Sequence, residues 1–381
     1  MAYLPFRVEF SEFAIADLHR RLDATRWPEV PFASGWAAGT EDVPLRDLVR
    51  WWRFEFDWFE VQRWLNGFAH LRGPIGEQEE LHCVVLSGSG GGGAGAGGAP
   101  RTPLLLLHGW PGSFIELLPA AERLARGVDG EAYDIVVPSL PGFGFSDAPR
   151  QPGMHPGRIA ERMHELMRGL GYERYGVQGG DWGAHIGARL ARAHPEAVLG
   201  LHLNFPAGLV PPAGEPDAEE RATQQALDGL RAAEGAYSRV QRTKPHSLGY
   251  ALTDSPVGLL AWMLQMFWGW SEHGEDLWAS LDRRLVLANV TLYWLTKTAL
   301  PASRTSFEAE HEQPPWVAGR SEVPTAYARY PGEPWPVARS AIERSYRLER
   351  WSEPERGGHF AALEQPALFA ADVASFFGGL R

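Results

Sequence analysis

Cysteine is almost missing from this sequence, since Cys83 is the single one among 381 residues. One thiol can form neither a disulfide within the chain nor a cysteine cluster for a metal ion, which fits a reducing compartment. Long apolar runs are missing as well, and the first ten residues lack the basic region and apolar block of a signal peptide. We therefore expect a cytoplasmic protein without a membrane anchor.

Positive charge is also in short supply. The chain carries 36 Lys and Arg against 47 Asp and Glu, a formal net charge of −11. An acidic chain without a long basic run is a poor ligand for nucleic acid or anionic membranes, so we exclude both as partners. Neither a Gly-rich phosphate fingerprint nor metal-ligand spacing of His occurs, so we expect no cofactor and no metal.

Tryptophan, in contrast, is abundant, with 16 residues. In the first 80 residues these aromatic side chains accompany apolar residues at helical spacing, which predicts a mostly helical N-terminal module over residues 1–80. One helix is expected over residues 17–26, stopped by Pro28, and the tryptophans are expected to pack the module against a neighbour. Residues 81–100 should form a strand followed by a flexible Gly-rich loop.

Short apolar runs alternate with helical stretches after residue 100, which predicts an α/β fold with a mostly parallel sheet covered by helices. We expect a first part of this core at 101–206, a helical lid at 207–300 and a second part of the core at 301–381. A lid that leaves from the carboxyl ends of the strands can roof a ligand site. The predicted strands are 104–107, 133–138, 175–177, 198–204, 323–330 and 346–351, and the predicted helices are 114–125, 159–170 and 361–377.

A strand, a sharp turn and a helix are predicted around residues 177–183, with Asp181 at the apex between glycines. Such a tight turn needs small flanking residues and lifts one side chain clear of the sheet. A carboxylate in that place suits attack at a saturated carbon, which would leave an ester on the enzyme. Alone the motif is weak, because turns that contain Gly and Asp are common.

Three neighbouring features strengthen this interpretation. Residues 108–113 follow a buried strand and open a helix, so the backbone N–H groups of Trp110 and Trp182 can form an oxyanion hole. Glu333 and His359 each follow a later predicted strand. The order nucleophile, acid, histidine at successive strand ends is that of a catalytic triad on the α/β-hydrolase fold.

Taken together, the motifs resemble the microsomal-type epoxide hydrolases, which combine this fold with an N-terminal epoxide-hydrolase module. The resemblance spans nearly the whole chain. It implies Asp181 as nucleophile, Glu333 as triad acid, His359 as base, and Tyr237 as a lid phenol that donates to the epoxide oxygen. The motifs that carry it are His108-Gly-Trp-Pro-Gly-Ser, Gln178-Gly-Gly-Asp-Trp-Gly, Thr243-Lys-Pro-His-Ser-Leu-Gly, Asp254-Ser-Pro-Val-Gly-Leu, Leu292-Tyr-Trp-Leu-Thr and Arg356-Gly-Gly-His-Phe.

One position departs from that family's pattern, because Ser306 stands where the resemblance places a second tyrosine. Three alternatives follow: Tyr237 works alone, Tyr293 or Tyr330 replaces the missing phenol, or activity is reduced or restricted to strained epoxides.

The reaction that we expect converts an epoxide and water to a vicinal diol through an Asp181 ester. Trp262, Phe267, Trp268, Tyr293 and Ser306 are candidates to line a pocket for a bulky apolar or aromatic epoxide, although most of the lid aromatics are expected to pack the lid core. A haloalkane dehalogenase with the same nucleophile and a non-catalytic ligand-binding relative stay open as alternatives. The oligomeric state also stays open, with a homodimer as one alternative.

Overall fold

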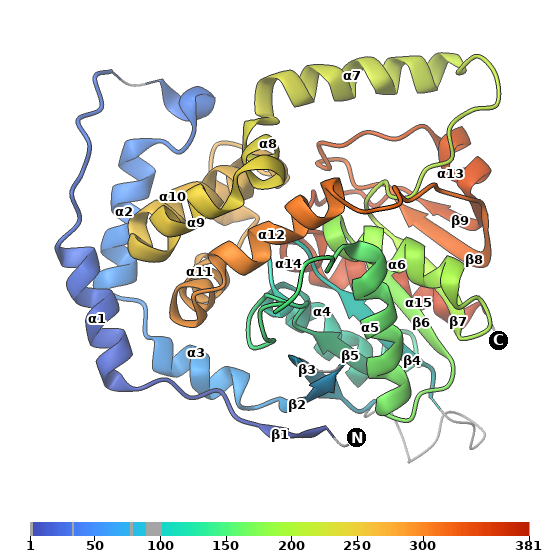
Figure 1. Cartoon of the computed structure of the whole chain (residues 1–381), viewed down its shortest axis with the longest axis horizontal. Coiled ribbons are helices and arrows are strands. Elements are labelled where there is room, and N and C mark those ends of the chain that lie inside the picture. Colours follow the sequence, from blue (N-terminus) through green and yellow to red (C-terminus); the bar gives the residue numbers. More distant parts are fainter. Residues whose placement is uncertain (1–2, 33, 77–78, 89–100, 381) are drawn as a thin grey trace.

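A nine-stranded sheet forms the centre of the molecule in the computed structural model, which describes residues 3–32, 34–76, 79–88 and 101–380 (Figure 1). The strand order is β1-β2-β3-β5-β4-β6-β7-β8-β9. The predicted Gly-rich loop falls on residues 89–100, outside the described residues. The strands are β1 (Leu4–Phe6), β2 (Ala69–Ile75), β3 (Glu79–Leu86), β4 (Pro103–Leu107), β5 (Asp134–Pro138), β6 (Tyr175–Gly179), β7 (Val198–Leu203), β8 (Ser321–Ala328) and β9 (Tyr346–Ser352).

The strands from β5 to β9 in this order are parallel, as predicted, and β1, β2 and β3 add an antiparallel edge. Every residue of β4 and β6 is buried, because helices cover both faces and leave no solvated side. On one face α5 (Pro156–Gly169) packs on α6 (Asp181–Ala193), and on the other α4 (Phe114–Arg126) packs on α15 (Pro366–Gly378). The carboxyl ends of β4 and β6 therefore meet at one edge.

The N-terminal segment is mostly helical, as predicted, but it also contributes β1 and β2 to the sheet. Its helices are α1 (Glu12–Asp23), the 3-10 helix η1 (Gly35–Ala38), α2 (Asp42–Phe54) and α3 (Trp58–Leu65). The helix predicted to reach residue 26 ends at Asp23, where Thr25 folds back and its hydroxyl donates to the Leu22 carbonyl. This segment is thus part of the sheet rather than a purely helical module.

A helical lid is inserted between β7 and β8, and it runs further than predicted. The predicted boundary at residue 300 is corrected to residue 310, because α12 packs on α8 and α9. In Figure 1 the helices α8 to α12 lie between the N-terminal helices and the sheet, and α7 extends along the outer edge. The lid elements are α7 (Ala218–Glu234), α8 (Ala236–Thr243), α9 (Pro245–Asp254), α10 (Pro256–Trp270), the 3-10 helix η2 (Leu277–Ala279), α11 (Arg283–Thr296) and α12 (Ala299–Glu310).

Tryptophans connect the N-terminal segment to the lid. The indole N–H of Trp52 on α2 donates to the hydroxyl of Thr291 on α11 at 2.9 Å, and both groups are buried. Trp36 stacks on Trp268 of α10 with ring centroids 4.3 Å apart. The prediction that the tryptophans pack this segment against a neighbour is confirmed for Trp52.

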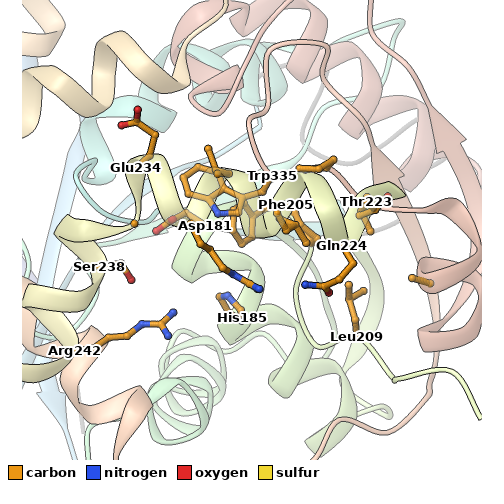
Figure 2. A pocket seen from close by; sticks show the side chains of 18 of the residues that line it. Asp181, His185, Phe205, Leu209, Thr223, Gln224, Glu234, Ser238, Arg242 and Trp335 are labelled. Carbon is orange, nitrogen blue, oxygen red and sulfur yellow. The ribbon is translucent and has the colours of Figure 1, made fainter. Parts of the chain in front are cut away.

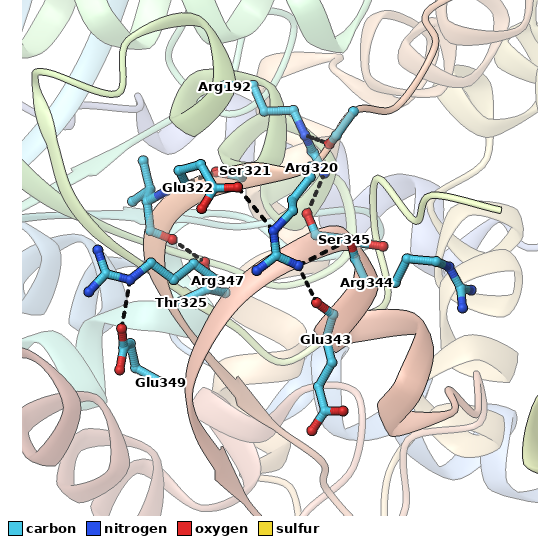
Figure 3. Close-up of polar contacts among 12 residues, drawn as sticks. Arg192, Arg320, Ser321, Glu322, Thr325, Glu343, Arg344, Ser345, Arg347 and Glu349 are labelled. Carbon is cyan, nitrogen blue, oxygen red and sulfur yellow. Dashed lines mark hydrogen bonds and ion pairs between the residues drawn. The ribbon is translucent and has the colours of Figure 1, made fainter. Parts of the chain in front are cut away.

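Polar contacts fasten the chain where it returns from the lid to the sheet (Figure 3). Arg320, just before β8, donates to the carbonyl of Glu343 on α13 (Arg339–Ser345) at 2.5 Å and to the carboxylate of Glu322 at 3.0 Å. Arg192 of α6 donates to the carbonyl of Gly319, which precedes β8, and to the carbonyl of Ser345 at 3.4 Å. These bonds fix the start of β8 against α6 and α13.

The closing helix predicted over residues 361–377 is divided in two, α14 (Ala361–Glu364) and α15. Pro366 lacks a backbone N–H, so it begins α15 instead of continuing α14. Within the described ranges, no helix combines the length and the apolar character required to cross a membrane.

Candidate active site

Asp181 lies at the sharp turn between β6 and α6, with a left-handed φ of 47°. This conformation is unfavourable for a residue with a side chain and is typical of a functional turn. The turn is possible only because its neighbours lack side chains: a Cβ on Gly183 would lie 2.1 Å from the Leu107 carbonyl oxygen, and one on Gly109 would lie 2.1 Å from Asp181 Oδ1. The predicted role of glycine at this elbow is therefore confirmed for Gly183.

The turn after β4 holds one oxygen of the nucleophile. The Trp110 backbone N–H donates to Asp181 Oδ1 at 2.9 Å. Two side chains of α11 hydrogen-bond to the same turn. Asn289 Nδ2 donates to the Pro111 carbonyl at 2.8 Å, and the Tyr293 hydroxyl donates to the Gly112 carbonyl at 2.6 Å. The position of the donor is thus fixed by the lid as well as by the sheet.

His359 and Glu333 complete the arrangement, as the sequence predicts. His359 Nε2 lies 3.5 Å from Asp181 Oδ2, and His359 Nδ1 lies 3.0 Å from Glu333 Oε2. Both side chains are buried, and the His359 backbone N–H donates to the Trp270 carbonyl at 2.8 Å. The structure therefore brings all three predicted triad residues together in the order acid, histidine, nucleophile.

Charge coupling in this triad changes the proton affinities. Burial disfavours the charged imidazole, but the carboxylates of Glu333 and Asp181 outweigh it and raise the pKa of His359 to about 10. Burial alone would raise the pKa of Asp181, but His359 and the N–H groups of Trp110 and Trp182 outweigh it and lower that pKa. Asp181, the predicted nucleophile, is therefore held as a carboxylate beside an imidazolium.

Tyr237 of α8 faces the same place from the lid side. Its ring stacks on the Trp110 ring with centroids 5.5 Å apart and contacts Trp270 at 5.2 Å. Burial and the nearby charge of Asp181 raise the pKa of its phenol, so the hydroxyl stays protonated. No acceptor for this hydroxyl occurs among the described residues, which leaves it available to a ligand.

A cavity of about 1280 Å³ opens above Asp181. Figure 2 shows Asp181 and His185 between Ser238 and Arg242 of α8 on one side and α7 on the other. The wall near the nucleophile is mostly aromatic, whereas the outer wall on α7 and α8 is mixed polar and apolar. The aromatic wall consists of Trp110, Trp182, Phe205, Tyr237 and Trp335.

Four predicted pocket residues lie elsewhere, and this prediction is corrected. Trp262, Phe267, Trp268 and Tyr293 do not line the cavity. Phe267 packs on Phe360, Trp268 stacks on Trp36, Trp262 packs against the lid core, and Tyr293 uses its hydroxyl on Gly112. The three side chains of α10 pack in this way because that helix is apolar on most of its surface and is largely covered by neighbouring elements.

Neither alternative phenol reaches the cavity. The Tyr293 hydroxyl is engaged with the Gly112 carbonyl, and Tyr330 is buried against Gly357. Ser306, in contrast, does line the cavity, and its hydroxyl donates to Gln241 Oε1 at 3.2 Å. Tyr237 is the one tyrosine among the described residues that line this cavity.

A second, smaller cavity contains a residue that sequence reasoning missed. It measures about 20 Å³ and lies beside Asp181 and His359. Its wall includes Glu116, whose carboxyl packs against Gly112. Burial raises the pKa of this carboxyl to about 8. The sequence Ser113-x-x-Glu116 signals a helix start, but nothing in it shows that the carboxyl lies beside the nucleophile.

Comparisons with known proteins agree with this geometry. Residues 3–117 match the family model described as epoxide hydrolase N terminus, and residues 102–234 match the alpha/beta hydrolase fold. A Stigmatella aurantiaca protein assigned to the epoxide hydrolases is 39% identical over 99% of this chain and 85% of its own length. Epoxide hydrolase 1 of Oryctolagus cuniculus is 32% identical over 98% of this chain and 88% of its own length. The chain belongs to the epoxide hydrolase family.

Solved structures of epoxide hydrolases have the same fold. The juvenile hormone epoxide hydrolase of Bombyx mori, 32% identical, superposes with a TM-score of 0.87 over 100% of this chain and 94% of that one. The Aspergillus niger epoxide hydrolase, 28% identical, gives 0.86 over 100% and 97%. The predicted family and α/β-hydrolase fold are thereby confirmed. Among the described residues of this epoxide hydrolase family member, no His, Cys, Asp and Glu side chains group to hold a metal ion.

Proposed function

We propose that this chain hydrolyses epoxides to vicinal diols through a covalent ester on Asp181. One observation carries the proposal: a carboxylate on a constrained turn, held by the Trp110 N–H at 2.9 Å, meets an imidazole at 3.5 Å and shares its cavity with an unengaged phenol. A carboxylate and a phenol on one cavity suit a ring opening, in which one attacks carbon and the other protonates oxygen.

In the first step Asp181 Oδ2 attacks a ring carbon while Oδ1 stays on the Trp110 N–H. The ring C–O bond breaks, its electron pair goes to the oxygen, and that oxygen takes the proton of Tyr237. Water in the cavity then relays the proton of the His359 imidazolium to the phenolate, which restores the phenol and leaves the imidazole neutral. The raised pKa of the phenol keeps the proton in place until negative charge develops on the ring oxygen.

In the second step water cleaves the ester. The ester has no charge, so His359 loses the carboxylate that helped to raise its pKa, and, having given its proton to the Tyr237 phenolate, it can accept a proton from water. The resulting hydroxide attacks the Asp181 carbonyl carbon, and the Trp110 and Trp182 N–H groups hold the oxyanion. When the oxyanion collapses, the ester C–O bond breaks and the departing diol oxygen takes the proton from His359. The new Asp181 carboxyl then transfers its proton to His359, which restores the carboxylate and the imidazolium. The 20 Å³ cavity beside both residues is polar and large enough for one water.

The cavity also supports a substrate class. An aromatic wall next to the nucleophile and a volume of about 1280 Å³ suit a bulky apolar or aromatic epoxide. We therefore expect faster turnover of large aryl or polycyclic epoxides than of short aliphatic ones.

Oxygen labelling tests the proposal directly. A single turnover of a styrene-type epoxide in ¹⁸O-water should place label in Asp181, which mass spectrometry of the peptide detects. The His359→Gln variant should accumulate the alkylated peptide, and Asp181→Asn should form none. Absence of both label and adduct with aryl and polycyclic epoxides would refute the proposal, and halide release from haloalkanes would assign the chain to dehalogenases instead.

A further inference from the structure

An amide in the wall of the catalytic cavity uses only part of its hydrogen-bonding capacity. Gln241 is 1% exposed and lines the same cavity as Asp181 and Tyr237. Its Oε1 accepts a hydrogen bond from the Ser306 hydroxyl at 3.2 Å, whereas its Nε2 has no acceptor among the described residues. A buried donor without an acceptor is rare and unfavourable, so it requires an explanation.

The position of this amide on the lid gives that explanation. Gln241 follows Tyr237 by four residues on α8, so the two side chains project from the same face of the helix. Tyr237 lies close enough to Asp181 for the carboxylate charge to raise the pKa of the phenol. Gln241 is therefore one helical turn away from the proposed proton donor, in the wall above the nucleophile.

We infer that Gln241 is a second hydrogen-bond donor to the ring oxygen of the epoxide, and that Ser306 is its positioning residue. The inference rests on the proposed function. When the ring C–O bond breaks, the oxygen carries negative charge and has lone pairs for two donors. Tyr237 transfers its proton, and the Gln241 N–H group stabilises the charge without giving up its proton.

Ser306 has a defined part in this arrangement. Its hydroxyl occupies the amide oxygen, so the amide turns its nitrogen away from Ser306. Ser306 is 5% exposed and also lines the cavity. Ser306 thus acts by orienting the Gln241 amide.

Alkylation kinetics test the inference. In the His359→Gln background the ester accumulates, so the change in intrinsic tryptophan fluorescence, to which the tryptophans of the cavity wall contribute, can follow its formation in a stopped-flow instrument. Gln241→Leu should lower the alkylation rate constant by about 100- to 1000-fold, the order of magnitude for one lost donor to a developing oxyanion. The matched control Gln225→Leu, at an exposed position of α7 outside the cavity wall, should leave it unchanged.

Two further variants separate donation from mere packing. Gln241→Glu keeps the side-chain size but donates only when protonated, so its alkylation rate should recover as the pH falls through the pKa of the new carboxyl. Gln241→Leu combined with Ser306→Tyr should recover part of the rate, because a phenol from α12 supplies a donor again. A purely structural role for Gln241 predicts neither the new pH dependence nor the recovery.

The inference is wrong if a folded Gln241→Leu variant alkylates within twofold of the parent. If that variant does not fold, the pH profile of Gln241→Glu decides, and a profile unchanged from the parent would also overturn the inference. Failure of the proposed function looks different, because then the parent and Gln225→Leu would form no ester with any epoxide.

Discussion

At the scale of single residues, the charge on Asp181 sets the proton affinity of His359. In the free enzyme, His359 and the Trp110 N–H keep Asp181 ionised, and the carboxylates of Glu333 and Asp181 keep His359 protonated. Alkylation removes one charge from this pair. In the proposed mechanism the same histidine is therefore a counter-ion first and a base afterwards.

This coupling predicts different pH dependences for the two steps. Asp181 has a lowered pKa and Tyr237 a raised one, so alkylation should be flat across neutral pH and decline only when pH falls below the ordinary range of an Asp. Ester hydrolysis should rise with pH through a His359 pKa that lies below about 10, since the Asp181 charge is gone. Stopped-flow measurement of both rate constants checks this, and an alkylation rate that rises through the His range would contradict it.

Tyr237→Phe isolates the phenol. Without a proton donor the departing oxygen is left as an alkoxide, so the alkylation rate constant should fall by about 100-fold or more. Hydrolysis of the ester, once formed, should change little. Tyr250→Phe is the control, because Tyr250 is 75% exposed on α9 and lies outside the cavity wall. Equal effects of the two substitutions would exclude a catalytic role for Tyr237.

At the scale of elements, a buried carboxylate ties the last helix to the sheet. Asp372 of α15 accepts from Arg350 at 2.7 Å and Ser352 at 2.8 Å, and it lies 2.9 Å from His202 Nε2. Burial would raise its pKa, but His202, Arg350 and Ser352 outweigh burial and hold that pKa well below its usual range. One side chain thus joins β7, β9 and α15.

Removal of the Asp372 charge should destabilise the fold without changing the rate constants for alkylation and ester hydrolysis. Asp372→Asn removes the charged acceptor of Arg350, whose side chain is partly solvated, so we expect the free energy of unfolding to fall by about 1–3 kcal/mol in urea titrations. Because folding lowers the pKa of Asp372, its charge stabilises the fold at pH values above the ordinary Asp pKa, and this stabilisation is lost as pH falls below that value. The free energies of unfolding of the parent and of Asp372→Asn should therefore converge in acid. Asp228→Asn, at an exposed ion pair of α7, should change little.

The core elements were predictable from the sequence because their signals are local. The buried run at 104–107 and the turn around Asp181 allow few other conformations. In contrast, β2 contains Gly73 and Pro74 and has no alternation of apolar and polar residues, so the sequence predicts a mostly helical module there and no strand. Its strand character comes from pairing with β1 and β3, which the sequence does not show.

The triad was predictable from the sequence, whereas the cavity wall was not. Asp181, Glu333 and His359 follow strands whose order places their ends at one edge. The wall depends on which face of each lid helix turns inward. α10 is apolar on every side, so Trp262, Phe267 and Trp268 carry no directional signal, and the contact between Gln241 and Ser306 joins helices 65 residues apart.

At the scale of the whole molecule, the N-terminal segment supports both the sheet and the lid. It extends the sheet beyond β3, and its α2 contacts α11, the helix that grips the turn of Trp110. The contact between Trp52 and Thr291 is buried at this junction. We therefore expect the junction to contribute to the stability of the lid.

A double-mutant cycle measures that contribution. Trp52→Phe leaves the Thr291 hydroxyl without its donor and should lower the free energy of unfolding by about 1–3 kcal/mol. Thr291→Val removes the acceptor, and the double variant should be more stable than the sum of the single losses predicts, because both partners are then absent. Strict additivity of the two losses would show that the indole and the hydroxyl do not interact.

Asn289 and Tyr293 of α11 hydrogen-bond to the carbonyls of residues 111 and 112. For protein engineering, the lid therefore has one part that holds the catalytic turn and another that does not. Helix α7 lines the outer wall of the cavity, and in the described chain it makes no such bond to the turn. Exchange of α7 alone keeps Tyr237 and Gln241 of α8 in place, so it should give enzymes of altered scope with an intact catalytic centre. A graft that replaces α11 as well would have to rebuild the hold on that centre before any new selectivity could be tested.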